Sequence, residues 1–506
     1  MNLISQLNTL ESSGMIRLLR AKPELEYLFR HALAQDAAYS SLLKQDRKRL
    51  HLAVGEALEH LYPGQHDELA ATLAYHFEKA EIREKAIHYF TLAGDRARDG
   101  YANAEAVVFY RAAISQIEHP LGKDTEQPEG WREKLARLFE SLADVLELTG
   151  RHEAAIDTYQ QALTELAQLG RPDRIEQARI HRKIGFVLTV NHQFAKAQQV
   201  WDQAEIVLDQ PPSEPVLSEQ ANTWRREWIE IQVERIWNHY WQLDTDGMER
   251  AYEKVLPVME QYGAPLQRAR VLTGLCMMRF QRDRIVASDE TLAVGRDALT
   301  AAMASGNLGV IFDTQFLLGL MHLTRREFGS AEENLQPAMR LAERSGDAIR
   351  ESRCVNYLMT LARMRGDVAE TRRYTAQVLN TAWAGQMVNY TAAAKASLAW
   401  IAWREGDLAE AREQGHKSLE LVKSVAAAQF KWTALWPLVG VALAEQNLPE
   451  AVEYARTLLG PKQMRQPDEI TAALVAAIAA SEQNKIEEAV AQLNHAMNLA
   501  QEMGYI

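Results

Sequence analysis

One pattern recurs at residues 326–331 (REFGSA), 366–371 (GDVAET), 406–411 (GDLAEA) and 446–451 (QNLPEA). The blocks begin at 326, 366, 406 and 446, so the period is 40 residues. An amphipathic segment precedes each block and another follows it. A fixed period of this length predicts a solenoid of helical hairpins, because a single hairpin cannot bury its apolar face without neighbours on both sides.

The residue types within each block fit a tight turn between two antiparallel helices. Gly366 and Gly406 suit the left-handed conformation that ends a helix, and the Asp or Asn that follows the turn can cap the next helix. Thirteen residues before the end of each block lie Leu318, Leu358, Leu398 and Leu438. Seven residues after it lie Ala338, Val378, Ser418 and Leu458. Apolar or small residues at these positions let the paired helices approach closely.

The repeat resembles the tetratricopeptide repeat family. The resemblance rests on the Gly-Asp turn, on the Leu of the first helix, on the small residue that follows it, and on Ala331, Ala411 and Ala451 in the second helix. The standard unit of that family is about 34 residues. The longer unit here is similar to the repeats of bacterial signalling ATPases of the maltose-regulon-activator type. The resemblance implies an all-α fold, a right-handed superhelix of roughly nine or ten hairpins that presents a binding surface.

Composition narrows the class of protein further. The chain has 506 residues, 47% of them hydrophobic, and a net charge of −12, which argues against broad affinity for nucleic acid or anionic membranes. No apolar run reaches the length of about 20 residues that a membrane span requires. The two cysteines, Cys276 and Cys354, are expected to be reduced and buried. We therefore expect a cytoplasmic protein.

The N-terminal segment is the only part with a β pattern. Residues 3–10 are amphipathic, and residues 15–20 and 25–30 can pair as a hairpin. A helix followed by such a hairpin resembles the end of a winged-helix module. The run from 29 to 51 resembles the segment that follows the ATPase core in STAND-type signalling ATPases, including those linked to cyclases or transcription regulators. This resemblance implies that the chain is the C-terminal arm of such a protein, or a stand-alone relative, with the ATPase core absent.

These patterns predict three segments. Residues 1–60 form the winged-helix remnant and a connecting helix, 61–120 form a helical connector or imperfect first repeat, and 131–506 form the repeat superhelix. Polar, Pro-containing stretches at 119–130 and 209–215 are predicted to be loops. The helix around Trp224 to Trp241 has apolar residues on two faces, which favours packing between neighbours over an aromatic cage.

The first helix of each hairpin lines the concave surface in this repeat family. A groove with Arg and Trp there suits an acidic or aromatic peptide or protein segment, although a merely solvated groove fits the same residues. The expected inward positions are Arg279, Asp313, Arg353, Asn356, Arg363, Trp400, Trp403, Arg404 and Trp436.

Catalysis finds no support in the motifs. The sequence holds no Gly-x-x-x-x-Gly-Lys-Ser/Thr loop, and His152-Glu153 lacks the second His of a metalloprotease helix. We expect no catalytic residue, cofactor or metal, and a non-enzymatic interaction and sensor arm. One alternative is a small-molecule effector site near residues 228–280. A weaker one is DNA binding through the N-terminal remnant, where the basic run at 47–49 otherwise fits a solvated helix face.

Overall fold

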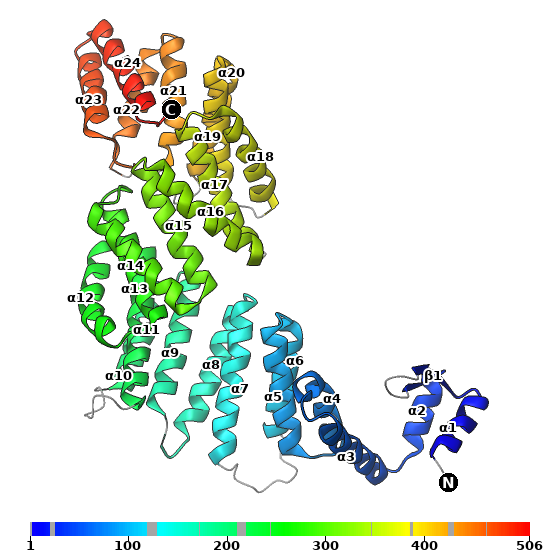
Figure 1. Ribbon diagram of the computed structural model, residues 1–506. Coiled ribbons are helices and arrows are strands. Elements are labelled where there is room, and N and C mark those ends of the chain that lie inside the picture. The colour runs from blue at the N-terminus through cyan, green and yellow to red at the C-terminus, as the bar shows by residue number, and fades with distance from the viewer. Residues whose placement is uncertain are drawn as a thin grey trace. The chain divides into compact units, whose positions relative to one another are not determined.

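The computed structural model describes residues 3–20, 26–118, 129–171, 173–209, 219–242, 244–345, 347–384, 388–423, 430–461 and 463–506. Its described residues form 24 helices and one two-stranded sheet (Figure 1). The prediction of an all-α solenoid is confirmed. The chain divides into two compact units, Met1–Asp209 (unit 1) and Gln210–Ile506 (unit 2). This boundary falls inside the range 131–506 that the repeat pattern assigns to one superhelix.

Unit 1 begins with a small module and continues as packed helical pairs. Its elements are α1 (Leu3–Ser12), β1 (Ile16–Arg20), β2 (Glu26–Phe29), α2 (Ala32–Ser41), α3 (Lys44–Leu61), α4 (His66–Lys79), α5 (Arg83–Asp99), α6 (Asn103–Glu118), α7 (Glu129–Leu148), α8 (His152–Ala167), α9 (Arg174–Val190) and α10 (Phe194–Leu208). The strands pair antiparallel with Ile16 opposite Phe29, which confirms the predicted hairpin. The hairpin turn at 21–25 and most of the two predicted loops lie outside the described residues.

The interface between α9 and α10 is built around one tryptophan. Trp201 is fully buried, and its indole N–H donates to the carbonyl of Arg182 at 3.1 Å. A Cβ added at Gly185 would lie 2.1 Å from the Trp201 Nε1, so only glycine leaves room for the ring at that position. Close packing of this hairpin therefore depends on a Gly-Trp pair.

A buried carboxylate joins α7 to α9. Glu140 accepts hydrogen bonds from Nε and Nη2 of Arg179, both at 2.8 Å, and forms an ion pair with Lys183 at 2.8 Å. Burial alone raises the pKa of the Glu140 carboxyl, but the hydrogen bonds from Arg179 and the charge of Lys183 together lower it to about 2. The ionised form is thus favoured in the folded state.

This carboxylate makes the stability of unit 1 depend on acid pH. Between its usual pKa of 4.5 and the folded value of about 2, the unfolded chain binds the proton that the folded chain does not. We therefore expect about 3 kcal/mol of stability, present above pH 4.5, to be lost as the pH falls through this window. Urea unfolding at a series of pH values measures this slope. The Glu140→Gln variant should flatten it, whereas a change at the exposed Glu133 should not; equal slopes in all three proteins would contradict the assignment.

Unit 2 consists of seven consecutive helical hairpins. Its helices are α11 (Glu219–Trp241), α12 (Thr245–Tyr262), α13 (Pro265–Arg282), α14 (Asp289–Ser305), α15 (Leu308–Thr324), α16 (Phe328–Ser345), α17 (Ala348–Met364), α18 (Val368–Ala384), α19 (Val388–Glu405), α20 (Leu408–Lys423), α21 (Trp432–Ala444), α22 (Leu448–Leu458), α23 (Asp468–Glu482) and α24 (Ile486–Glu502). Each odd-numbered helix from α11 to α19 also contacts the next odd-numbered one. We call α11, α13, α15, α17, α19 and α21 the inner layer.

The turns between hairpin helices have the predicted chemistry. Gly366 and Gly406 adopt left-handed φ values of 76° and 85°. The Asp367 carboxylate then accepts from the backbone N of Glu370 at 2.9 Å, as an N-cap does. The last residues of the four blocks are fully buried, as close approach of the paired helices requires: Ala331, Thr371, Ala411 and Ala451.

The remaining core predictions concern α11 and the cysteines. On α11, Ile229, Val233 and Ile236 are buried in a cluster with α12 and α13, so the helix packs between neighbours as predicted. Cys276 and Cys354 are both free and buried. Burial raises the pKa of each thiol to about 12, which leaves both as unreactive thiols at neutral pH.

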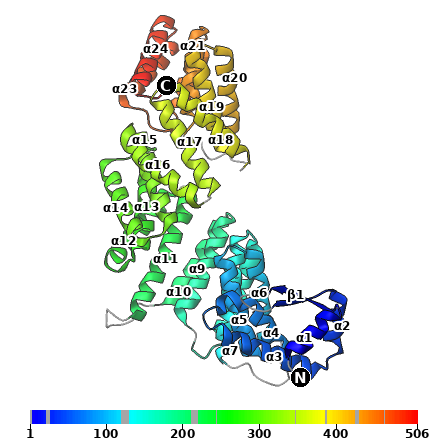
Figure 2. The same cartoon turned by 45° about the vertical axis from the view of Figure 1, so that its right-hand side comes forward.

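The C-terminal hairpins fold back on earlier turns of unit 2. The Arg284 guanidinium donates to the carbonyls of Gly460 and Gln463, each at 3.1 Å. Arg326 lies over the Tyr505 ring, 5.4 Å from its centroid. Gly504 lies against Met364 of α17 and Tyr505 against Trp432 of α21, and both views place the chain end near α21 and α24 (Figures 1 and 2). These contacts join residues about 180 positions apart, which a purely nearest-neighbour stack does not predict.

Candidate functional site

The predicted groove residues occupy two kinds of environment. Asn356, Arg363, Trp400 and Trp436 are buried, with at most 5% of each residue exposed. These four residues lie between successive inner-layer helices, which pack directly against each other. Arg279, Asp313, Arg353 and Trp403 are partly exposed, and Arg404 is exposed.

The structure brings Asp313 and Arg353 together near the start of α17. Asp313 accepts from Arg350 at 3.2 Å, and the guanidinium of Arg353 lies 5.4 Å from the Phe316 ring centroid. Burial raises the pKa of the Asp313 carboxyl. Burial also opposes the charge of Arg353, but its interaction with Tyr390, to whose oxygen it donates a hydrogen bond, and the nearby Asp313 raise the pKa of its guanidinium. This part of the predicted site is a real charged cluster with partial access to solvent.

Trp403 and Arg404 lie further along α19. Trp403 packs on α21, where a Cβ added at Gly440 would lie 2.4 Å from its indole nitrogen. Arg404 lies over the Trp400 ring at 5.8 Å. Among the described residues, neither Trp403 nor Arg404 contacts the cluster around Asp313. The residues predicted to line one groove therefore occupy separate patches.

Arg363 acts as a buried cation that joins three inner-layer helices. Its guanidinium donates to the carbonyl of Thr433 at 2.6 Å and to that of Ala396 at 3.4 Å. It also lies 5.7 Å from the Trp400 ring centroid and 6.0 Å from that of Trp432. Burial lowers the pKa of this guanidinium to about 9, so it stays protonated at neutral pH. Its partners are carbonyls and aromatic faces, which suits a structural role.

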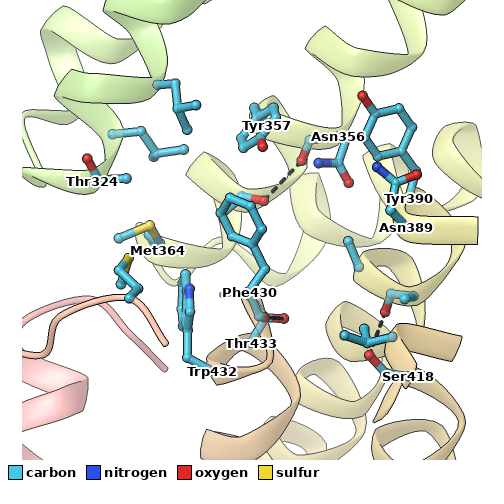
Figure 3. Close-up of a pocket in the computed structure, with 17 residues that line it drawn as sticks. Thr324, Asn356, Tyr357, Met364, Asn389, Tyr390, Ser418, Phe430, Trp432 and Thr433 are labelled. Carbon is cyan, nitrogen blue, oxygen red and sulfur yellow. Dashed lines mark hydrogen bonds between the residues drawn. The ribbon is translucent and has the colours of Figure 1, made fainter. Parts of the chain in front are cut away.

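A cavity of about 90 Å³ lies between α15, α17, α19, α20 and the start of α21. In Figure 3, Asn356, Tyr357 and Tyr390 lie on one side of it, and Phe430, Trp432 and Thr433 on the other. Among the described residues, its lining contains no charged side chain. The lining residues are Leu320, Leu323, Thr324, Asn356, Tyr357, Thr360, Met364, Asn389, Tyr390, Ala392, Ala393, Ser418, Val422, Phe430, Trp432, Thr433 and Met464.

Of the cavity residues, only Asn356 was predicted from the sequence. Tyr357 directly follows the predicted residue Asn356, and Tyr390 lies on the same helix as the predicted residue Trp400. Including more residues of these helices in the prediction could have found both. Phe430 lies just before α21, and Trp432 is the first residue of that helix. The 40-residue repeat pattern singles out no residue at either position. The cavity also lies outside residues 228–280, the range predicted for a small-molecule site.

The basic run on α3 is largely neutralised. Lys48 forms an ion pair with Glu81, and Arg49 pairs with Asp46 at 3.4 Å. Arg47 lies over the Tyr39 ring at 5.3 Å. This arrangement favours the solvated helix face over a phosphate-binding surface. Within the described ranges, no group of three or more His, Cys, Asp or Glu residues is placed to hold a metal ion. None of the helices in those ranges is both long and apolar enough to cross a membrane.

Comparison with known proteins supports the fold. No protein-family model matches the chain. An uncharacterized protein of Rhizobium meliloti (strain 1021) is 29% identical over 125 residues, which cover 24% of this chain and only 12% of that protein. A STAND protein with a tetratricopeptide repeat sensor from Pyrococcus horikoshii matches with a TM-score of 0.51 at 14% identity, covering 86% of this chain and 61% of that one. Apo RapI matches with a TM-score of 0.47 at 9% identity, covering 73% and 97%. The chain is thus a tetratricopeptide-like helical-repeat protein in fold.

Proposed function

We propose that this chain is a non-catalytic sensor and scaffold arm that binds protein partners in a signalling system of the STAND ATPase type. Stacked hairpins of this fold present extended binding surfaces. The resemblance of residues 29–51 to the segment after the ATPase core supports the ATPase context. The structurally similar Pyrococcus protein is described as a STAND protein with a repeat sensor, which supports the same role for this arm.

The observation that carries the proposal is the exposed apolar surface of the N-terminal module, residues 3–61. Neither α1 nor α2 buries a single residue. Leu3, Leu33 and Leu43 are 67%, 82% and 73% exposed. Large apolar side chains exposed to this extent on several elements of one small module are typical of a surface that another protein covers. We assign this module, which resembles the winged-helix remnant of that family, as the face that docks on an ATPase.

The partly exposed inner-layer residues form the second proposed contact region. Arg353 with Phe316, and Arg404 with Trp400, pair a cation with an aromatic ring on the same layer. Both rings are buried, so a partner would contact the guanidinium groups, which suit the carboxylates of an acidic segment, and the partly exposed Trp403. Arg279, Asp313, Arg353, Trp403 and Arg404 remain our candidates for this contact.

Affinity capture from the native cell extract tests the docking face. We expect the full chain to retain a protein that carries a Gly-x-x-x-x-Gly-Lys-Ser/Thr loop, identified by mass spectrometry. The Leu33→Asp/Leu43→Asp variant should lose it, because two charges interrupt the apolar surface. The exposed Arg404→Glu change is the matched control and should retain it. Capture by the double variant at the wild-type level would contradict docking through this module, and loss with Arg404→Glu alone would move the ATPase contact to the inner layer.

A small-molecule effector is the second candidate function. The cavity between α15, α17, α19, α20 and α21 favours it, because ligand sites are concave, mostly apolar and carry a few polar groups. The two functions are compatible, since a sensor arm can bind an effector in one unit and a partner in the other.

A further inference from the structure

We infer that the cavity lined by Asn356 and Trp432 binds an uncharged, one-ring aromatic molecule that carries a hydrogen-bond donor and an acceptor at opposite ends. The inference deepens the proposed sensor function and rests on it, since the bound molecule would be the effector. It is carried by two buried residues that line the cavity and each hold a polar atom without a partner among the described residues, together with the size and the neutrality of the lining.

The two unpartnered atoms are of opposite kinds. Asn356 is 5% exposed and Trp432 is 3% exposed, and both line the cavity. Within the described part of the chain, neither the Asn356 Oδ1, an acceptor, nor the Trp432 Nε1–H, a donor, has a hydrogen-bond partner. A buried polar atom left unpaired costs about 1–3 kcal/mol. A ligand with an N–H or O–H for Asn356 and a carbonyl or hydroxyl oxygen for Trp432 would remove both costs.

Other hydroxyl groups in the lining are already satisfied by the protein. Thr360 donates to the carbonyl of Asn356 at 3.0 Å, Ser418 to that of Ala392 at 2.7 Å, and Thr433 to that of Phe430 at 2.8 Å. Two of these bonds are visible in Figure 3. These three hydroxyl protons are therefore not available to a ligand. A polyhydroxylated molecule such as a sugar would bury several unpaired hydroxyls here, which disfavours that class.

The charge and the shape of the cavity lining narrow the class of ligand further. The described lining holds no charged side chain, and burial raises the pKa of Tyr357, which keeps its phenol neutral. The lining itself offers no charged side chain to an ionised ligand, and the buried guanidinium behind it, Arg363, already donates to the carbonyls of Thr433 and Ala396, so an ionised ligand is disfavoured. Tyr357 and Phe430 meet edge to face, 6.3 Å apart, and Trp432 adds a third ring. Aromatic walls favour a flat ring, and the volume of about 90 Å³ exceeds several-fold the 10–15 Å³ that one water requires.

Titration calorimetry and thermal shift with three neutral probes test the inference. The probes are 4-hydroxybenzamide, 4-aminobenzamide and 4-hydroxyacetophenone, and 4-hydroxybenzoate is the charged counterpart. We expect saturable binding of at least one neutral probe, with the carboxylate at least about tenfold weaker. Binding of none of the three, or binding of 4-hydroxybenzoate as tight as that of the neutral probes, would overturn the inference.

Matched variants of the full chain locate the bound probe. Asn356→Leu and Trp432→Phe each remove one unpaired atom and leave an apolar side chain in its place, and each should weaken binding about tenfold. Ser418→Ala removes a hydroxyl that the protein already satisfies, and it should leave the affinity within about threefold. Unchanged affinity in both Asn356→Leu and Trp432→Phe would overturn the site. Failure of probe binding while the ATPase is still captured would reject only this inference, whereas failure of capture with intact probe binding would reject only the docking proposal.

Discussion

Replacement of Arg363 by glutamate is expected to destabilise unit 2 by about 5 kcal/mol or more, enough to unfold it. The variant would place a carboxylate against the carbonyl oxygens of Thr433 and Ala396, which now accept from the guanidinium. It would also set a negative charge among the π faces of Trp400 and Trp432. Arg363 is 1% exposed, so the new charge has no route to water. Urea unfolding monitored by circular dichroism and tryptophan fluorescence measures the loss.

The same chain offers a matched control for this result. Arg404 contacts the same Trp400 ring but is exposed, so Arg404→Glu should change stability by less than about 1 kcal/mol. Arg363→Met keeps much of the volume and removes the buried charge, so we expect it to remain folded. A folded Arg363→Glu protein with wild-type stability would show that this side chain reaches solvent and would restore its assignment to the groove.

Replacement of Trp201 by alanine is expected to lower the free energy of unfolding of unit 1 by about 3–5 kcal/mol. The ring is fully buried, and its loss would leave a cavity against Gly185, which has no side chain to fill it. The variant also removes the hydrogen bond to the carbonyl of Arg182. Urea unfolding of the full chain, followed by circular dichroism, measures the change.

Ile206 on the same helix supplies the comparison. Its side chain is 66% exposed, so Ile206→Ala should stay within about 0.5 kcal/mol of wild type. Gly185→Ala tests the contact from the other helix, because the added methyl would overlap the indole and force α9 and α10 apart. If Trp201→Ala and Ile206→Ala prove equally stable, the α9–α10 interface does not depend on this ring.

The helical hairpins could be predicted because their requirements are local. Gly406 supplies the left-handed turn, Asp407 caps the following helix, and Ala411 lets the two helices meet. Each of these requirements acts within a few residues along the chain, so a period of 40 was enough to place the turns and the helices around them. The hairpin between β1 and β2 followed in the same way from two short apolar runs.

The candidate site could be predicted only in part, because exposure is not a local property. Counting from the turn assigned Arg363 and Trp400 to the inner layer, but the distance between α17, α19 and α21 decides whether such a position opens to solvent. That distance depends on residues remote in sequence. Trp432 packs on the C-terminal Tyr505 at 5.5 Å, and Arg284 holds the segment at Gly460 to Gln463.

Local sequence was therefore sufficient for the class of fold, the repeat and its turns, since these depend on backbone conformation and capping between near neighbours. Tertiary packing alone decided that Arg363 is a buried structural cation and that Asn356 lines a cavity. It also decided that the repeats separate into two units after Asp209. These outcomes depend on the way in which side chains from distant parts of the sequence fill the space between helices. The sequence of a single repeat does not specify that packing.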